Sequence, residues 1–125
     1  MEAALRNKLI QEIPELENQI YPTNAPEGVT TPYMVYARIS TDIDKTLEGY
    51  ENTGSISYMF SIMASRYSDM VRIRNEIEET IKAMSKTHIG EQRVYIKDIN
   101  INNVTEQYEH ELKVNRGIID FTIFY

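Results

Sequence analysis

The sequence predicts an α+β domain in which two amphipathic helices flank a mixed, mainly antiparallel sheet. Three observations lead to this fold class. Apolar residues recur at helical spacing in two segments, apolar and polar residues alternate with a period of two in others, and loops separate the alternating segments. The predicted order is helix, strand, strand, strand, helix, strand, strand. A length of 125 residues suits one domain, and we assign residues 1–125 to it.

The N-terminal segment predicts a helix from Glu2 to about Ile13. One apolar stripe runs along it at three- and four-residue spacing, formed by Leu5, Leu9, Ile13 and Leu16. Pro14 either ends this helix or begins a further short turn, because proline cannot continue an α-helix. The apolar residues 19–22 are expected to open a first, short strand, and residues 23–31 are expected to form an irregular loop.

Residues 33–40 predict the next strand, because β-forming residues dominate and the near-continuous apolar run suggests that both faces are covered. Residues 41–54 are polar and acidic and predict a long connecting loop. The clearest strand covers residues 55–64, where the side chains alternate over ten residues. We expect Ile56, Tyr58, Phe60, Ile62 and Ala64 to pack on the core, and the serine and methionine face to be half exposed or to meet another subunit.

The second helix is predicted to begin at Ser68, whose hydroxyl can cap it, with Asp69 in its first turn. Its buried stripe is the strongest helical signal in the chain and consists of Met70, Ile73, Ile77, Ile81 and Met84. Glu78 and Lys82 form an i,i+4 pair on its flank, and Gly90 marks the exit.

Two strands are predicted after this helix. Residues 94–102 alternate, with a change of face near Asp98 that is typical of a β-bulge. Residues 103–109 predict a turn, and residues 111–125 predict the final strand. One face of that strand carries Ile119, Phe121, Ile123 and Tyr125.

Composition excludes several classes of protein. The net charge is 13 − 19 = −6, whereas a free-standing nucleic-acid-binding domain of this size is normally basic. Cysteine is absent, so disulfides, thiolate metal sites and cysteine nucleophiles are excluded together. No apolar run approaches the roughly 20 residues of a membrane span, and we expect neither membrane association nor a secretory leader.

No catalytic, cofactor-binding or metal-binding residue is assigned. The sequence contains no glycine-rich phosphate loop and no nucleophile elbow. His88 and His110 are far apart, and the neighbours of His110 point to opposite faces of a strand, so a metal site is not expected. Spatial proximity is not encoded in sequence, and a carboxylate acid/base pair therefore stays an open alternative.

Negative charge gathers in two predicted connections, and aromatic residues are numerous. Residues 41–54 carry Lys45 against four acids, namely Asp42, Asp44, Glu48 and Glu51. Residues 101–112 have no lysine or arginine and carry Glu106, Glu109 and Glu111. The ordinary interpretation is solvated loops. Most of the nine tyrosines and three phenylalanines should lie in the core, but some aromatics are candidates for a subunit interface: Tyr58, Phe121, Phe124 and Tyr125.

The whole layout resembles the tail-completion, or tail-terminator, proteins of long-tailed bacteriophages and prophages. The matching pieces are spread over nearly all residues: the N-terminal helix leading to Ile20-Tyr21-Pro22, the loop leading to Pro32-Tyr33-Met34-Val35-Tyr36, the alternating strand that runs into the 67–85 helix, and the pairing of Tyr108-Glu109-His110-Glu111-Leu112 with Asp120-Phe121-Thr122-Ile123-Phe124-Tyr125. The order, spacing and total length of these pieces carry the resemblance.

The resemblance implies a non-enzymatic assembly protein that needs no cofactor. Such proteins form a ring, typically of six subunits, at the head-proximal end of the tail tube. The ring stops tube growth and offers a surface to the head connector, and DNA later passes through its lumen without specific binding. The implied partners are further copies of the chain, the major tail tube protein and the connector or stopper protein. The implied location is the head–tail junction of the virion, after synthesis in the bacterial host cytoplasm.

Two hypotheses follow for a ring. The acids of 41–54 or 101–112 line the lumen or an end face, where they repel DNA phosphates. A strand edge forms the contact between subunits, either the final strand or the short strand at 19–21. Three alternatives stay open: another neck or tail adaptor, a small ligand-binding or enzymatic domain, and an accessory protein whose fold looks alike.

Overall fold

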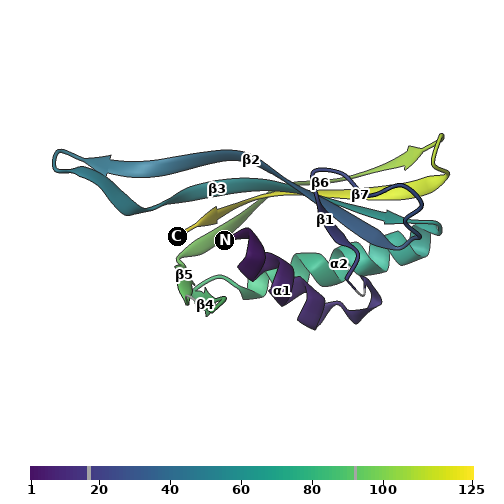
Figure 1. The fold of residues 1–125 in the computed structure, drawn as a ribbon, viewed down its shortest axis with the longest axis horizontal. Helices are drawn as coiled ribbons and strands as arrows, with labels where there is room; N and C mark the ends of the chain where they lie inside the picture. Colours follow the sequence, from purple (N-terminus) through teal and green to yellow (C-terminus); the bar gives the residue numbers. More distant parts are fainter. Residues whose placement is uncertain (17, 92) are drawn as a thin grey trace.

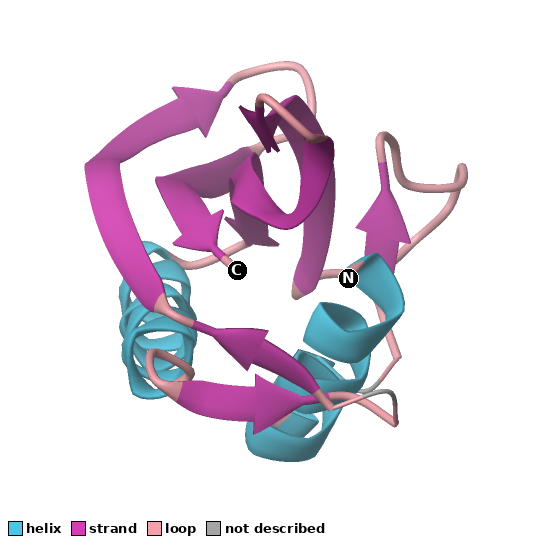
Figure 2. Ribbon diagram, turned by 90° about the vertical axis from the view of Figure 1, so that its left-hand side faces the viewer, coloured by secondary structure: helices cyan, strands magenta, loops and turns pink. Residues whose placement is uncertain are grey.

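In a computed structural model of the protein, two helices pack on one face of a five-stranded, twisted sheet (Figure 1 and Figure 2). The structure describes residues 1–16, 18–91 and 93–125, and it describes no side chains at 50 and 51. Its elements are α1 (Glu2–Glu12), the 3₁₀ turn η1 (Pro14–Leu16), β1 (Ile20–Pro22), β2 (Tyr33–Thr46), β3 (Gly49–Ala64), α2 (Tyr67–Ala83), β4 (Thr87–Ile89), β5 (Val94–Ile96), β6 (Asp98–Glu109) and β7 (Val114–Phe124). The predicted α+β class is confirmed.

Both helices bury the stripes that their spacing predicts. Leu5, Leu9, Ile13 and Leu16 are each at most 3% exposed, and Pro14 both follows the end of α1 and begins η1. The stripe of α2, from Met70 to Met84, is at most 1% exposed. Each fully buried aliphatic side chain contributes roughly 1.5–3 kcal/mol of hydrophobic free energy. These stripes therefore fix both helices to the sheet.

The start of α2 differs from the prediction. The helix begins at Tyr67, its N-cap is Arg66, and no side chain caps it. Ser68 therefore lies inside the first turn instead of before it. The serine is displaced because β3 runs almost directly into the helix, leaving only Ser65 and Arg66 between the two elements. Asp69 lies in the first turn, as predicted.

The sheet has the strand order β1-β2-β3-β7-β6, with β1 and β2 parallel and every other neighbouring pair antiparallel. Its helix-covered face carries the core, and the predicted alternation of β3 is confirmed. The largest buried side chains on this face come from the two central strands and are Tyr58, Phe60, Ile62, Ile119, Phe121 and Ile123.

The opposite face of the sheet is covered only at one end. There Tyr33, Met63 and Val114 form a small second cluster, against which Ala25 and Val29 of the 23–31 loop pack. The prediction that residues 33–40 are covered on both faces is therefore wrong beyond the first residues of β2, because the loop does not extend farther along the strand. From Ile39 onward β2 is exposed.

Residues 41–54 do not form the predicted loop. They continue β2 and β3 into a long antiparallel hairpin that turns at Leu47 and Glu48. Gly49, with φ of 129°, takes a backbone conformation at this turn that favours glycine. The segment looks loop-like in sequence because both of its faces meet solvent, so burial imposes no alternating apolar pattern on it.

The chain between α2 and β7 also differs from the prediction. β4 and β5 form a separate two-stranded sheet, so Gly90 lies in their connection (φ of 76°) and not at the helix exit. The face change near Asp98 is the break between β5 and β6, and the register shift lies between Ile101 and Asn103. Residues 103–109 belong to β6. The turn lies at 110–113 and β7 begins at Val114, because Lys113 has a φ of 56° that interrupts the strand.

Candidate functional site

The most prominent surface feature is a hairpin that projects from the body of the protein (Figure 1). We call residues 39–54 the arm. Its large apolar side chains are exposed: Ile39 at 60%, Ile43 at 55% and Leu47 at 108%. Exposed aliphatic residues that gather on one projecting element mark a surface for association.

The two faces of the arm differ in chemistry. Cross-strand partners share a face, and Ile43 pairs with Gly54 while Thr41 pairs with Ile56. Since Ile56 is buried in the core, Ile43 lies on the helix side of the sheet. Asp42 pairs with Ser55 and lies on the opposite side. The arm therefore carries Ile43 on the face that continues the core face and Asp42 on the face without helices.

The acids predicted in 41–54 are placed on the arm. Asp42, Asp44 and Glu48 are exposed, and Asp44 accepts a hydrogen bond from the Thr53 hydroxyl at 2.7 Å. The side chain of Glu51 lies outside the described residues. The negative charge of this segment is thus carried by a regular hairpin.

Two of the three acids of the second acidic segment, Glu106 and Glu109, form ion pairs within the chain, whereas Glu111 is exposed. Glu106 pairs with Arg74 at 3.1 Å, and hydrogen bonding from Tyr67, followed by Arg74, lowers the pKa of its carboxyl group. Glu109 accepts a hydrogen bond from Gln107 at 2.5 Å and pairs with Arg116 at 3.3 Å, and both partners lower its pKa. The negative electrostatic field of Glu106 and Glu109 is therefore weaker than a count of the charges in residues 101–112 implies.

Of the four aromatic residues predicted as interface candidates, two are buried in the core and two are partly exposed. Tyr58 and Phe121 are 1% and 0% exposed, so they lie in the core of their own chain and are not accessible to a partner. They are buried because β3 and β7 are the central strands under the helices. Phe124 is 39% exposed, and Tyr125 is half-buried against the core.

The root of the arm is held by a cluster that sequence reasoning missed. Arg38, just before the arm, forms an ion pair with Glu2 of α1. Burial opposes ionisation of Glu2, but backbone and Arg38 hydrogen bonds outweigh it and lower the pKa of the carboxyl group. Burial, followed by the charge of Glu2, raises the pKa of Tyr58 beneath them. No sequence signal joins these residues, because the pairing spans 36 positions.

The sheet has two open edges. β1 pairs only with Met34–Tyr36, so the outer edge of β2 beyond this point has no strand beside it in the described chain. β6 forms the other edge over its twelve residues. The final strand, β7, lies between β3 and β6, so the prediction that it forms an edge is wrong. The predicted edge position of the short strand, β1, is confirmed.

The helix-free face of the sheet carries hydroxyl and amide groups that bond across strands. Ser57 and Thr122 lie 2.9 Å apart, and Asn102 donates to the Thr122 hydroxyl at 2.9 Å. Arg116 on this face donates to the Ser61 hydroxyl at 2.9 Å, while Glu109 balances its charge. These groups satisfy one another and leave a polar, weakly charged surface.

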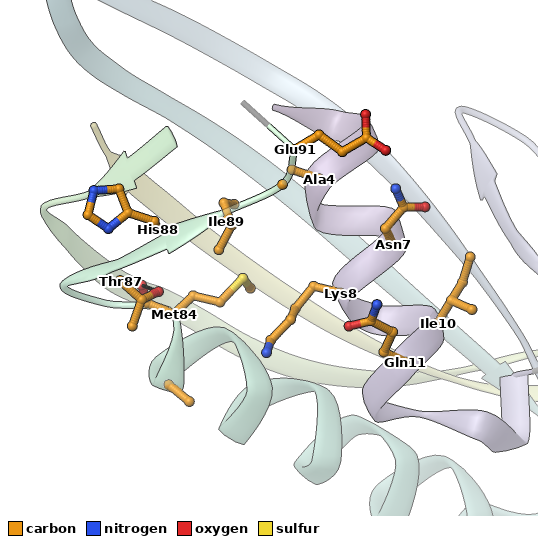
Figure 3. Close-up of a pocket in the computed structure, with 12 residues that line it drawn as sticks. Ala4, Asn7, Lys8, Ile10, Gln11, Met84, Thr87, His88, Ile89 and Glu91 are labelled. Carbon is orange, nitrogen blue, oxygen red and sulfur yellow. Dashed lines mark hydrogen bonds between the residues drawn. The ribbon is translucent and has the colours of Figure 1, made fainter. Parts of the chain in front are cut away.

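A hollow with a volume of about 600 Å³ lies between α1 and β4 (Figure 3). Aliphatic groups from both elements line it, and Lys8, Gln11 and Asn7 stand along α1. Among the described residues no group of three acidic, histidine or cysteine side chains is close enough to hold a metal ion. Within the same residues, no helix combines the length and apolarity needed to cross a membrane.

Comparisons with known proteins extend the description of the fold. No protein-family model matches the chain, and no curated protein matches it in sequence. Among solved structures, a chain from the virion of a native gene transfer agent (GTA) particle has a similar fold, with a TM-score of 0.71 at 9% sequence identity. The match covers 99% of this chain and 92% of that chain. It shows that the two chains share one fold over nearly their whole length.

Proposed function

We propose that the protein is a structural component of a phage-like virion, not an enzyme, and that it forms a ring at the head-proximal end of the tail tube. There the ring ends tube polymerisation and offers a surface to the head connector. The observation that carries the proposal is the fold shared with a virion chain over 99% of the residues. The resemblance of the sequence to tail-completion proteins points in the same direction.

The open edges of the sheet supply a means of ring formation. The outer edge of β2 and the edge of β6 lie on opposite sides of the same sheet. Unpaired backbone groups at such edges pair readily with another chain. Joining two different edges gives a heterologous contact. Such contacts close into a ring when a whole number of equal rotations between neighbouring subunits makes one full turn.

The charge distribution supports DNA passage through the ring. Six copies carry a formal charge of 6 × −6 = −36. We place the helix-free face toward the lumen, since it presents Asp42 together with the hydroxyl and amide groups around Thr122. Such a surface repels phosphates and offers no cluster of cations to hold them.

A tube-capping assay tests the proposed function. The major tail tube protein encoded in the same genome is polymerised with increasing amounts of this protein, and tube length is measured by negative-stain electron microscopy. We expect tubes to shorten and to carry a ring at one end. Tubes of unchanged length, with the protein instead bound to a purified connector, would refute termination and favour an adaptor role.

Charge reversal tests the lumen assignment. Asp42→Lys is made, and the control is Glu27→Lys, at a position exposed elsewhere on the molecule. Both variants change the net charge by +2. We expect only the arm variant to gain salt-sensitive DNA binding in assembled rings. Equal DNA binding by the two variants would contradict the assignment.

A further inference from the structure

We propose that the tip of the arm inserts into the groove between α1 and β4 of a second copy of this chain. This inference rests on the proposed ring and names a side-chain contact within it. Backbone pairing at the strand edges does not by itself account for the exposed aliphatic residues of the arm.

The arm supplies an apolar anchor. Leu47 stands at the turn and is fully exposed, and Ile43 and Ile39 follow along the hairpin. A hairpin with this much exposed aliphatic surface is unfavourable in water unless a partner covers it. A single large side chain at the tip of a projecting element also has the geometry of an anchor residue that fills a pocket on a partner.

The groove supplies a matching cavity. Its volume is about 600 Å³, and its aliphatic lining includes Ala4, Ile10, Met84 and Ile89 (Figure 3). A neighbouring hollow of about 330 Å³ shares Ala4 and Ile89 with it and continues to Val94. Polar side chains of α1 and Thr87 also line the groove. Protein–protein contacts usually combine apolar and polar groups in this way.

The two surfaces carry opposite charge. The arm has one lysine and four acids, Asp42, Asp44, Glu48 and Glu51, and thus a charge of 1 − 4 = −3. The groove itself is lined by one cation, Lys8, and one anion, Glu91. The segment 86–97, which contains the lining residues 87–91, adds Lys86, Arg93 and Lys97, so that this segment has a charge of 3 − 1 = +2. In the part of the chain that the structure describes, these three cations form no ion pair. Opposite charge favours encounter and fixes the orientation of the partners.

The occupant of the groove has to be another molecule. Leu47 lies nine residues beyond Arg38, which corresponds to about 30 Å of extended strand. The arm runs away from the body, so its tip does not fold back to its own groove (Figure 1). Because arm and groove are different surfaces, each bound copy leaves one arm and one groove free for the next. The contact therefore propagates around a ring.

Cross-linking tests the contact directly. Because the chain has no cysteine, only the introduced cysteines can react with the cross-linker. Leu47→Cys protein is mixed with Asn7→Cys protein, since Asn7 lines the groove, and a short bismaleimide is added. The control replaces Leu47→Cys with Leu112→Cys, an aliphatic residue 61% exposed in the β6–β7 turn. We expect at least a fivefold excess of mixed dimer from the Leu47→Cys pair. Equal yields from the two pairs would overturn the inference.

Complementation of two defective variants gives a second, independent test. Leu47→Asp removes the anchor but leaves the groove intact, and Asn7→Trp fills the groove but leaves the arm intact. Each alone is expected to lose assembly beyond the monomer by light scattering, whereas a 1:1 mixture is expected to form heterodimers and nothing larger. Ring assembly by both variants at the wild-type concentration would refute the contact.

The proposed function and this inference fail in distinguishable ways. If wild-type protein forms rings that cap tubes but the Leu47→Cys pair shows no excess of cross-link, the arm contact is wrong and the ring stands. If the excess cross-link is found but no tube is capped, the arm contact stands and termination is wrong.

Discussion

The substitution Phe121→Ala tests whether the phenyl side chain of Phe121 belongs to the core of the protein or to a subunit interface. Phe121 is 0% exposed, and its ring centroid lies 4.7 Å from Phe60 at 80° and 5.8 Å from Tyr58 at 29°. Removing a buried phenylalanine costs about 3–5 kcal/mol. That loss is a large part of the roughly 5–15 kcal/mol that stabilises a domain of this kind.

Urea denaturation followed by far-ultraviolet circular dichroism measures the effect. With a slope of about 1.5 kcal/mol per molar urea, the unfolding midpoint should fall by about 2 to 3 M. Phe124→Ala is the matched control, because Phe124 is 39% exposed and should cost only about 1 kcal/mol. A Phe121→Ala protein with the wild-type midpoint but altered self-association would refute the core assignment.

Three further predictions concern the second acidic segment, the contact between α2 and β7, and the arm. Because the pKa of Glu106 is lowered in the folded protein, its contribution to stability is present above its unfolded pKa of 4.5 and is lost as pH falls through the folded value. Glu106→Gln should therefore lower the thermal midpoint at pH 7 and leave it unchanged near pH 2. Gly117→Ala should cost about 1–3 kcal/mol in urea denaturation, because the added carbon would lie 2.6 Å from the sulfur of buried Met70. Replacing residues 41–53 by a two-residue turn should leave the urea midpoint of the monomer unchanged, since the arm adds little to the core, but it should abolish tube capping; a large drop in the midpoint would contradict this independence.

The parts of the fold that sequence predicted are those in which one face is buried. The stripe of α2 and the alternation of β3 both follow from a core on one side and solvent on the other. Burial of one face requires apolar residues at the spacing of a helix or of a strand, so this spacing in the sequence predicts the type of element. The same logic identified the face that carries Ile119 and Ile123 in β7.

The strands that the sequence did not predict lack this difference between a buried face and an exposed face. The arm meets solvent on both faces, and residues 103–109 of β6 lie at an open edge with mostly exposed side chains. Their strand conformation comes from backbone pairing with β3 and β7, which leaves no trace in side-chain hydropathy. β4 and β5 are three residues each, too short for a period to show.

The candidate site was predicted in part for related reasons. Local composition placed the acids of the arm together, and the structure keeps them together on one hairpin. Pairing of Glu106 with Arg74 and of Glu109 with Arg116 depends on residues that are distant in sequence or on adjacent strands. Charge counted within one segment therefore overstates the field of residues 101–112.

The alternation of the arm sets a rule for how its length can change. Adding one residue to β2 between Asp42 and Ile43 would turn every following side chain of that strand to the opposite face. Adding two residues to each strand preserves the faces and extends the hairpin by about 7 Å. Lengthened variants that keep Ile43 and Asp42 on their present faces should thus differ from this chain by even numbers of residues per strand, and the reach of the arm should change in discrete steps.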